Sequence, residues 1–264
     1  RFDATNTLDN LMAAVITKIG LDHTAVLGNT IEKIAYEKCG ILRNCPVITS
    51  YRQDKKALEV IKTQANKLYI PDENALKVTN NQKLGNSFIY KGKEYELSLC
   101  GDYQVENALM VLETIENCKA DIPYNIIYES LKETKFPARM EIVRENPLII
   151  IDGAHNIDGA SVLANELKKF SGEAVAIIGM MKDKDFKEVL KTTLPYVKKA
   201  IAVEVKALPR SLKANELKSE AEKYCECDIA ESYEKAIEKA GDNPIFIFGS
   251  LYLAADIRKI LLKY

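Results

Sequence analysis

The chain of 264 residues lacks several patterns that would assign it to common protein classes. No G-x-G-x-x-G motif is present, so hydride transfer on a dinucleotide has no support, and no G-x-x-x-x-G-K-[ST] loop is present to cradle phosphates. The G-x-S-x-G motif of many serine hydrolases is absent too. With no apolar run of about 18 residues and no charged-then-apolar leader, we expect neither a membrane span nor secretion.

The net charge bears on the binding partners of the protein, and the cysteine spacing bears on its disulfides and its compartment. The formal net charge is -1, which provides no global field to attract nucleic acid or an anionic membrane. None of the six cysteines forms a C-x-x-C pair, and Cys225 and Cys227 are too close in sequence for an ordinary disulfide. We therefore expect reduced thiols in a cytoplasmic protein. The length and the 47% apolar content fit two globular domains.

Histidine is scarce, and both copies lie among other reactive residues. His23 follows Asp22 after V-I-T-K-I-G-L, which predicts a strand that ends in a glycine and presents both side chains at its terminus. Neutral imidazole at such a place can bind a divalent cation. A capping aspartate beside a surface histidine is the alternative, and the sequence leaves both open.

Lys38 lies in E-K-C-G, which is predicted to form the last turn of an amphipathic helix with Ile31 and Ile34 on its apolar face. Gly40 is a natural stop for this helix. A lysine here is either an ordinary solvated side chain or a point charge, with or without chemical modification, at an anionic site.

Residues 134–139 interrupt the pattern at Pro137, and we place the domain boundary at 136/137. The first part contains predicted elements of mixed type: a strand at 47–50, helices at 55–68, 102–118 and 124–133, and a hairpin at 86–99. The second part alternates strands and helices: strands at 148–151, 174–178, 200–205 and 244–248, and helices at 157–170, 183–197, 212–224, 232–240 and 250–262. This order predicts a parallel sheet with right-handed crossovers.

Ligands of such sheets bind beyond the carboxyl ends of the strands. The loops there with most chemistry are residues 152–156 (D-G-A-H-N) and 179–185 (G-M-M-K-D-K-D). Asp152 and His155 offer an acid and an imidazole around a glycine turn, which indicates a functional site. An ordinary β-α loop with a helix cap at Asn156 or Asp158 is the alternative.

Eight segments in order resemble the folylpolyglutamate synthases, a family of Mur-ligase-type ATP-dependent amide ligases. They are R-F-D-A-T-N (1–6), I-G-L-D-H-T-A-V-L-G-N-T-I-E-K-I-A-Y-E-K-C-G-I (19–41), G-D-Y-Q-V-E-N-A (101–108), F-P-A-R-M-E (136–141), D-G-A-H-N (152–156), G-M-M-K-D-K-D (179–185), L-P-R-S-L (208–212) and F-G-S-L-Y-L (248–253). The resemblance implies an α/β fold: the remnant of a central ATPase domain at 1–136 and a Rossmann-like glutamate-ligase domain with a mostly parallel sheet at 137–264.

The same resemblance implies a reaction and a set of sites. ATP activates a pterin-linked carboxylate to an acyl phosphate, which the amine of L-glutamate attacks. The implied magnesium ligands are His23 and a carbamylated Lys38, with K⁺ as a further candidate ion; Lys38 and His155 are the implied catalytic residues. The implied ATP contacts are Gln104, Asn107, Arg139 and Asp152, and those to the pterin are Phe2, Asp3 and Ala4.

The resemblance has departures and open alternatives. The family's H-Q is Tyr103-Gln104 here, its P-G-R is Pro137-Ala138-Arg139, and its final G-E is replaced by Ala255-Asp256. The family's phosphate loop, a magnesium-binding serine and a glutamate ligand would precede Arg1, so we expect a piece of a longer polypeptide that is inactive alone. We expect a cytoplasmic monomer that acts on folate or dihydropteroate. The alternatives are a folded but inactive fragment and a Mur-type ligase for UDP-muramoyl peptides.

Overall fold

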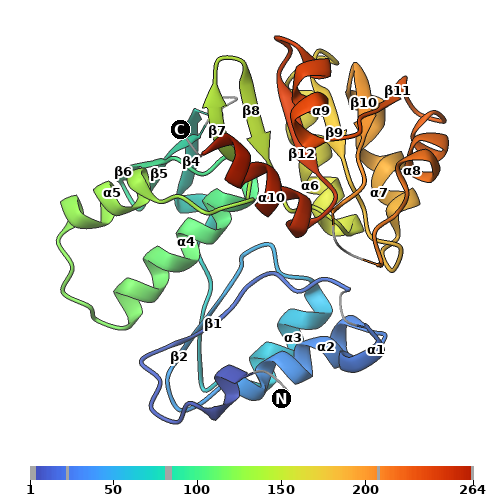
Figure 1. Cartoon of the computed structure of the whole chain (residues 1–264). Helices are drawn as coiled ribbons and strands as arrows, with labels where there is room; N and C mark the ends of the chain where they lie inside the picture. The colour runs from blue at the N-terminus through green and yellow to red at the C-terminus, as the bar shows by residue number, and fades with distance from the viewer. Residues whose placement is uncertain (1–3, 22–23, 81–84, 207–208, 263–264) are drawn as a thin grey trace. The chain divides into compact units, whose positions relative to one another are not determined.

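The computed structural model describes residues 4–21, 24–80, 85–206 and 209–262. The chain forms two compact units. The N-terminal unit consists mainly of residues before 134, and the C-terminal unit consists mainly of residues from 135 on, together with residues 99–101. Each unit has its own sheets and its own buried core, so each is considered separately (Figure 1).

The first part of the N-terminal unit is built on a small parallel sheet. Its strands are β1 (Ala14–Ile16), β2 (Pro46–Thr49) and β3 (Lys67–Tyr69), in the order β1-β2-β3. The accompanying helices are η1 (Ala4–Thr7), α1 (Thr24–Leu27), α2 (Ile31–Lys38), η2 (Cys39–Ile41) and α3 (Lys55–Gln64). Apolar side chains from β1, β2, α2 and α3 form one buried cluster, which fixes α2 against the sheet.

Two predicted boundaries in this region are wrong. The strand β1 ends at Ile16, so Gly20 does not close it. The end of α2 is as predicted, because the α-helix stops at Lys38 with Cys39 as its C-cap, and Gly40 lies in the short 3₁₀ turn η2 that follows. The helix α3 ends at Gln64 rather than at residue 68, because Ala65 is already extended and the chain enters β3.

The second part of the N-terminal unit combines an antiparallel sheet with two helices. The strands β4 (Leu76–Asn80), β5 (Asn86–Tyr90) and β6 (Lys93–Leu97) follow η3 (Glu73–Ala75), and Lys91 and Gly92 both have positive φ in the predicted hairpin turn. The helices are α4 (Asp102–Asn117) and α5 (Tyr124–Glu133). Four of the five residues on the predicted apolar stripe of α4 are buried: Val105, Ala108, Leu109 and Leu112.

The C-terminal unit is built around a six-stranded sheet with the order β11-β10-β9-β12-β8-β7 (Figure 1). Its strands are β7 (Glu141–Glu145), β8 (Leu148–Ile151), β9 (Val175–Ile178), β10 (Lys199–Ala202), β11 (Cys227–Ile229) and β12 (Ile245–Phe248). All neighbours pair in parallel except β7, which is antiparallel to β8. This confirms the predicted α/β class with a mostly parallel sheet.

Helices cover both faces of this sheet. The helices α6 (Ile157–Lys168), α7 (Phe186–Thr193) and α8 (Ala214–Ala221) pack on one face together with η4 (Leu194–Tyr196), and α9 (Tyr233–Ala240) and α10 (Leu251–Leu261) pack on the other. Along β8, Ile150 belongs to the first core and Ile149 and Ile151 belong to the second, as the two-residue period of a strand requires. Right-handed crossovers explain this split, because connections that run in opposite directions along the sheet must use opposite faces.

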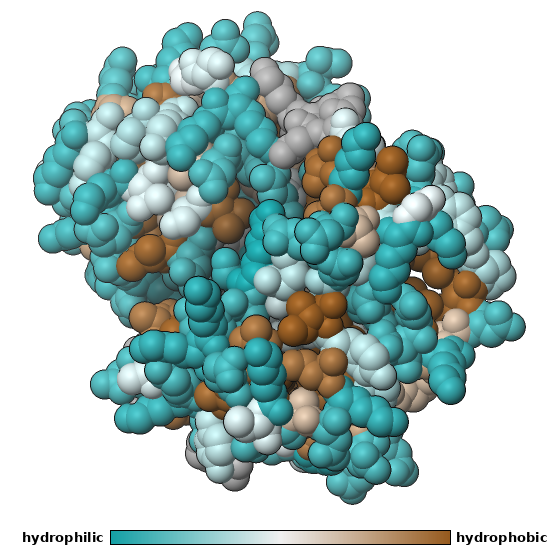
Figure 2. Space-filling view, turned by 180° about the vertical axis from the view of Figure 1, so that it is seen from behind, coloured by the Kyte–Doolittle hydropathy of each residue, from teal (hydrophilic) through white to brown (hydrophobic). Residues whose placement is uncertain are grey.

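The surface carries scattered apolar side chains. On the side seen in Figure 2, hydrophobic patches are separated by hydrophilic residues. Exposed apolar side chains of this kind are normal for a folded protein. No helix among the described residues is both long enough and apolar enough to cross a membrane.

Candidate functional site

Asp152 is the centre of the best-defined polar site in the C-terminal unit. It follows β8 directly, and its own N–H donates to the carbonyl of Ile247 in β12 at 2.9 Å. Its Oδ2 accepts from the N–H of Met140 at 2.9 Å and its Oδ1 accepts from the N–H of Ala154 at 2.7 Å. The carboxylate therefore ties the loop after β8 to the turn that precedes β7.

The environment of Asp152 acts on its pKa in opposite directions. The residue is only 8% exposed, and this burial raises the pKa of its carboxyl group above the ordinary range. The two backbone N–H groups of Met140 and Ala154 and the electrostatic effects of Arg139 and His155 work against the shift, because they favour the charged form of the carboxyl group. Burial is the largest of these effects.

Arg139 lies in a turn with an uncommon backbone. Ala138 and Met140 on either side of it have φ of 54° and 47°, in the left-handed region, which costs about 1 kcal/mol or more for each such residue. The carbonyl of Ala138 accepts from the N–H of Gly153 at 2.8 Å, and its N–H donates to Oε2 of Glu141 at 2.9 Å. The N–H of Gly153 and the carboxylate of Glu141 thus hold the backbone of this turn.

Gly153 allows this turn to pack closely on the loop after β8. A Cβ atom at this position would lie 2.5 Å from Cδ2 of Leu251, 2.9 Å from Nη1 of Arg139 and 3.2 Å from the carbonyl oxygen of Ala138. The guanidinium group of Arg139 therefore packs against Gly153, where a larger residue would displace the ends of the Arg139 and Leu251 side chains. Arg139 and Asp152, two of the predicted nucleotide contacts, are brought together here.

His155 is half-buried in the same loop. Its Nδ1 lies 2.7 Å from the carbonyl oxygen of Gly153, and because that oxygen can only accept, Nδ1 carries the proton in this contact. Asn156 caps α6 by accepting from the N–H of Gly159 at 2.9 Å. The helix-cap interpretation of this loop is therefore correct for Asn156, and His155 lies beside the cap with Nε2 left for other contacts.

The loops after β9 and β12 complete this edge of the sheet. Gly249 donates its N–H to the carbonyl of Ala154 at 2.9 Å, and a Cβ on it would lie 2.3 Å from Sδ of Met180. Ser250, which is buried, caps α10 by accepting from the N–H of Tyr252 at 3.1 Å. The carboxyl ends of β8, β9 and β12 therefore meet, as the rule for parallel sheets predicts.

Gln104 and Asn107 lie one turn apart on α4 in the N-terminal unit. Nδ2 of Asn107 donates to Oε1 of Gln104 at 3.1 Å, and Gln104 is buried. Near them, the buried carboxylate of Glu106 accepts a short hydrogen bond from the hydroxyl of Ser50, which follows β2. This bond holds the first turns of α4 against the carboxyl end of β2.

Lys38 is exposed at the last position of α2. Within residues 4–21, 24–80, 85–206 and 209–262, no hydrogen bond or ion pair involves its ammonium group, and no cluster of three or more acidic, histidine or cysteine side chains could hold a metal. An ammonium group repels a cation, so unmodified Lys38 does not fit a magnesium site. His23, Phe2 and Asp3 lie outside the described residues; Ala4 begins η1.

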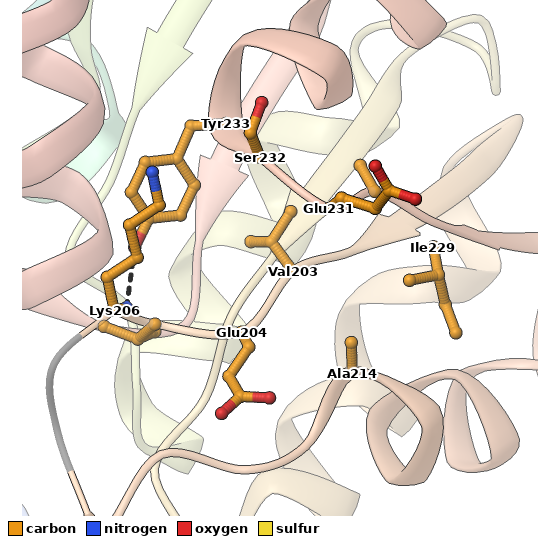
Figure 3. Close-up of a pocket in the computed structure, with 10 residues that line it drawn as sticks. Val203, Glu204, Lys206, Ala214, Ile229, Glu231, Ser232 and Tyr233 are labelled. Atoms are coloured by element: carbon orange, nitrogen blue, oxygen red, sulfur yellow. Dashed lines mark hydrogen bonds between the residues drawn. The ribbon is translucent and has the colours of Figure 1, made fainter.

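A separate cavity of about 580 Å³ lies at the carboxyl ends of β10 and β11, where Val203, Ala214 and Ile229 form apolar walls (Figure 3). The ammonium group of Lys206 lies 4.8 Å from the centroid of the Tyr233 ring, and the Lys206 N–H donates to the Tyr233 hydroxyl at 3.0 Å. None of the predicted site residues lines it.

Comparison with known families and structures identifies this architecture. The model of the Mur ligase middle domain matches residues 4–115, and that of the Mur ligase glutamate ligase domain matches residues 138–250. The chain belongs to the Mur ligase family. It is 35% identical to the dihydrofolate synthase/folylpolyglutamate synthase of Bacillus subtilis, and the alignment covers 99% of this chain and 65% of that protein.

Solved structures agree with this membership of the Mur ligase family. Folylpolyglutamate synthase of Mycobacterium tuberculosis, complexed with ADP and AMPPCP, has a TM-score of 0.82 at 27% identity and covers 100% of this chain and 66% of that one. The bifunctional synthase of Yersinia pestis, complexed with AMPPNP and a Mn ion, has a TM-score of 0.79 at 26% identity, over 98% of this chain and 63% of that one. The chain thus spans about two thirds of the length of these relatives.

Sequence reasoning about this Mur ligase chain missed two residues near the site. Glu141 stands in the F-P-A-R-M-E segment, and Arg258 lies in the predicted helix 250–262, but the resemblance implies a role for neither. Nε of Arg258 donates to both carboxylate oxygens of Glu141, at 2.8 and 3.0 Å. An acidic residue two positions after a motif arginine was the available signal for Glu141; the sequence offers none for Arg258.

Proposed function

We propose that this chain is part of an ATP-dependent ligase that joins L-glutamate to the γ-carboxylate of a folate polyglutamate through an acyl phosphate. The observation that carries the proposal is the 35% identity, over 99% of this chain, to a dihydrofolate synthase/folylpolyglutamate synthase. The same relative supports a second reaction, from dihydropteroate to dihydrofolate.

In this proposal residues 137–264 form the glutamate-ligase domain and residues 1–136 form part of the ATP-binding domain. Arg139 binds the polyphosphate of ATP, for which the planar guanidinium fork is suited. Asp152 contacts the nucleotide and also holds the Arg139 turn through the N–H of Met140. His155 lies near the incoming glutamate, with its imidazole oriented by the carbonyl of Gly153.

The remaining roles belong to residues 1–136. Gln104 and Asn107, which already contact each other on α4, bind ATP. His23 and a carbamylated Lys38 hold Mg²⁺, with K⁺ as a further ion; a structural neighbour that contains AMPPNP and a Mn ion supports a nucleotide and a divalent metal. Carbamylation turns the ammonium into a carboxylate, which removes the repulsion toward a cation. Phe2, Asp3 and Ala4 line the pterin site.

The proposal is tested on the active ligase, by which we mean this chain supplemented with the remaining third that its Bacillus subtilis relative contains. ATP, Mg²⁺ and L-glutamate are supplied with one acceptor at a time. Mass spectrometry then detects an acceptor extended by glutamate, and ADP release is followed in parallel. We expect tetrahydrofolate or dihydropteroate to be extended; extension of a UDP-muramoyl peptide alone would assign the chain to cell-wall synthesis instead. We also propose a cytoplasmic monomer, which sedimentation of the purified protein tests for its oligomeric state.

The chain spans 65% of the Bacillus subtilis relative, so we propose that it folds but has no ligase activity alone. Calorimetric titration with ATP and Mg²⁺ tests this. Binding at micromolar strength by the 264-residue chain would contradict the proposal that it is incomplete.

The assignment of Asp152 to the nucleotide has its own test. Asp152→Asn in the active ligase should raise the KM for ATP and leave the KM for glutamate close to that of the unsubstituted protein. An effect on the KM for glutamate alone would move Asp152 to the other substrate.

A further inference from the structure

The turn around Arg139 needs support from outside itself. Both neighbours of this arginine, Ala138 and Met140, have left-handed φ, at 54° and 47°. Residues with a Cβ atom keep such a backbone only where the surrounding structure fixes it. The direction of the Arg139 side chain therefore depends on the groups that hold the backbone of Ala138 and Met140.

Two carboxylates hold the N–H groups of these two neighbouring residues, one on each side of Arg139. Oδ2 of Asp152 accepts from the N–H of Met140 at 2.9 Å, and Oε2 of Glu141 accepts from the N–H of Ala138 at 2.9 Å. Asp152 already belongs to the proposed nucleotide site. Glu141 has no such role, yet it makes the equivalent contact on the other side of the arginine.

Glu141 is held in turn by the helix α10. Nε of Arg258 donates to both of its carboxylate oxygens, at 2.8 and 3.0 Å. The side chain of Glu141 is 13% exposed and that of Arg258 is 38% exposed, so the pair is partly sheltered from water. A carboxylate in such a place needs a charged partner to keep a fixed orientation. The chain of contacts runs from α10 through Glu141 to the Ala138 peptide.

We propose that Glu141 and Arg258 are positioning residues for Arg139: they fix the turn that presents its guanidinium group to the polyphosphate. The proposal rests on the proposed function, in which Arg139 binds the nucleotide. Glu141 and Arg258 themselves do not touch the substrate. Because both act through Arg139, their removal should weaken nucleotide binding only while Arg139 is present.

The first test needs no nucleotide and uses the 264-residue chain. The Nε–H resonance of Arg139 is assigned by its loss in Arg139→Ala. We expect Glu141→Ala, and more weakly Arg258→Ala, to move this resonance and to speed the hydrogen exchange of the Met140 backbone N–H, which donates to Asp152, about tenfold. Glu141→Gln, which keeps an oxygen for the Ala138 N–H, should preserve most of the protection. Arg144→Ala, an exposed arginine of the same strand β7, is the matched control.

The second test uses the active ligase and separates positioning from folding. Glu141→Ala should raise the KM for ATP about tenfold with little change in kcat, because a small displacement of a binding group is enough for such an effect. In an Arg139→Ala background the same substitution should add nothing. Arg258→Lys should restore part of what Arg258→Ala loses, since it keeps the charge opposite Glu141.

The outcomes distinguish this inference from the proposed function. An Arg139 resonance that is unchanged in Glu141→Ala would overturn the positioning role, as would a rise in KM that persists without Arg139. An Arg139→Ala variant with an unchanged KM for ATP would instead contradict the nucleotide role of Arg139. In that case the resonance experiment still decides whether Glu141 and Arg258 hold the turn. If backbone amides lost their protection from hydrogen exchange throughout the unit, including Ile177 in β9, the substitution would have caused a general folding defect. That result would also count against a positioning role for Glu141 and Arg258.

Discussion

The two units of this Mur ligase chain hold their proposed functional residues in different ways. In the C-terminal unit, backbone N–H and carbonyl groups hold Asp152 and His155 at 2.7–2.9 Å, and Arg139 packs closely against Gly153. In the N-terminal unit, Lys38 is exposed at a helix end, and within the described part of the chain its ammonium group has no polar partner.

This difference separates residues that contribute to both folding stability and function from residues that contribute to function alone. The polar site of the C-terminal unit is part of the fold, so a substitution there changes stability and ligand binding together. Lys38 contributes little to the fold, and its proposed role depends on chemistry that the polypeptide alone does not supply, namely carbamylation and a metal ion. Substitutions in the two units should therefore separate effects on the free energy of unfolding from effects on ligand binding and turnover.

The largest expected effect is on stability and comes from Gly249→Ala. Gly249 has φ of 111°, and a Cβ would lie 2.3 Å from Sδ of Met180 and 2.8 Å from the carbonyl oxygen of Gly179. We expect the free energy of unfolding to fall by about 4 kcal/mol, from overpacking plus backbone strain. Gly172→Ala is the control, because Gly172 has φ of 77° and nothing within 4 Å of its Cβ position; it should cost about 1 kcal/mol. Urea denaturation measures the free energy of unfolding of both variants. Equal losses for Gly249→Ala and Gly172→Ala would show that the loops after β9 and β12 are not tightly packed.

The next effect is on turnover and comes from Lys38→Ala. In the active ligase this substitution removes the proposed carboxylate beside the metal ions, and we expect kcat to fall on the order of a hundredfold or more. Because Lys38 is exposed, the free energy of unfolding should change by less than about 0.5 kcal/mol. Steady-state kinetics and urea denaturation of the same preparation measure both. An unchanged kcat would refute the role of Lys38 and with it the contrast between the units.

A smaller effect, dependent on pH, is expected from Asp152→Asn. Asparagine keeps one oxygen for the two N–H groups of Met140 and Ala154, so at acid pH the free energy of unfolding should fall by about 2 kcal/mol. Burial raises the pKa of Asp152 in the folded protein, so across the window above its ordinary value the folded state binds more protons than the unfolded state. Stability contributed by this group is therefore lost as pH rises. The difference in the free energy of unfolding between the unsubstituted protein and Asp152→Asn should shrink from acid to neutral pH. A difference that grows with pH would mean that folding lowers the pKa of Asp152 instead of raising it.

Much of the fold of the C-terminal unit could be predicted because its strands are unusually clear. β8, β9 and β12 are continuous apolar runs with both faces buried, and such runs leave little choice of structure. β11, with the sequence C-D-I, is too short and too polar to be recognised. Leu68 continues the helical spacing of the preceding segment although it lies in β3, so a local pattern was overridden by pairing with β2.

The site was predictable only in part, for a similar reason. Asp152 and His155 follow a clear strand, and the carboxyl edge of a parallel sheet is where ligand groups gather. The pair of Glu141 and Arg258 joins residues 117 positions apart, and no local pattern contains that contact. The left-handed backbone of Ala138 could not be predicted from the alanine itself, and the glycine that the family's P-G-R segment has at this position was the available hint of positive φ.

The smallest expected effect comes from Ala138→Gly, and its sign is the informative part. Ala138 is buried with φ of 54°, in a conformation that glycine adopts without strain. Relief of this strain should outweigh the loss of one methyl group from the core, so the free energy of unfolding should rise by about 0.5 kcal/mol. Lys91→Gly, at φ of 48° on the hairpin turn of the N-terminal unit, removes the same backbone strain, but it also loses the contacts of the Lys91 ammonium with Glu113 and Glu116. If Ala138→Gly stabilises the fold and leaves the Arg139 resonance in place, the turn is held by Asp152 and Glu141 rather than by its own residues. A destabilised variant would show instead that the alanine methyl group is what keeps the turn closed.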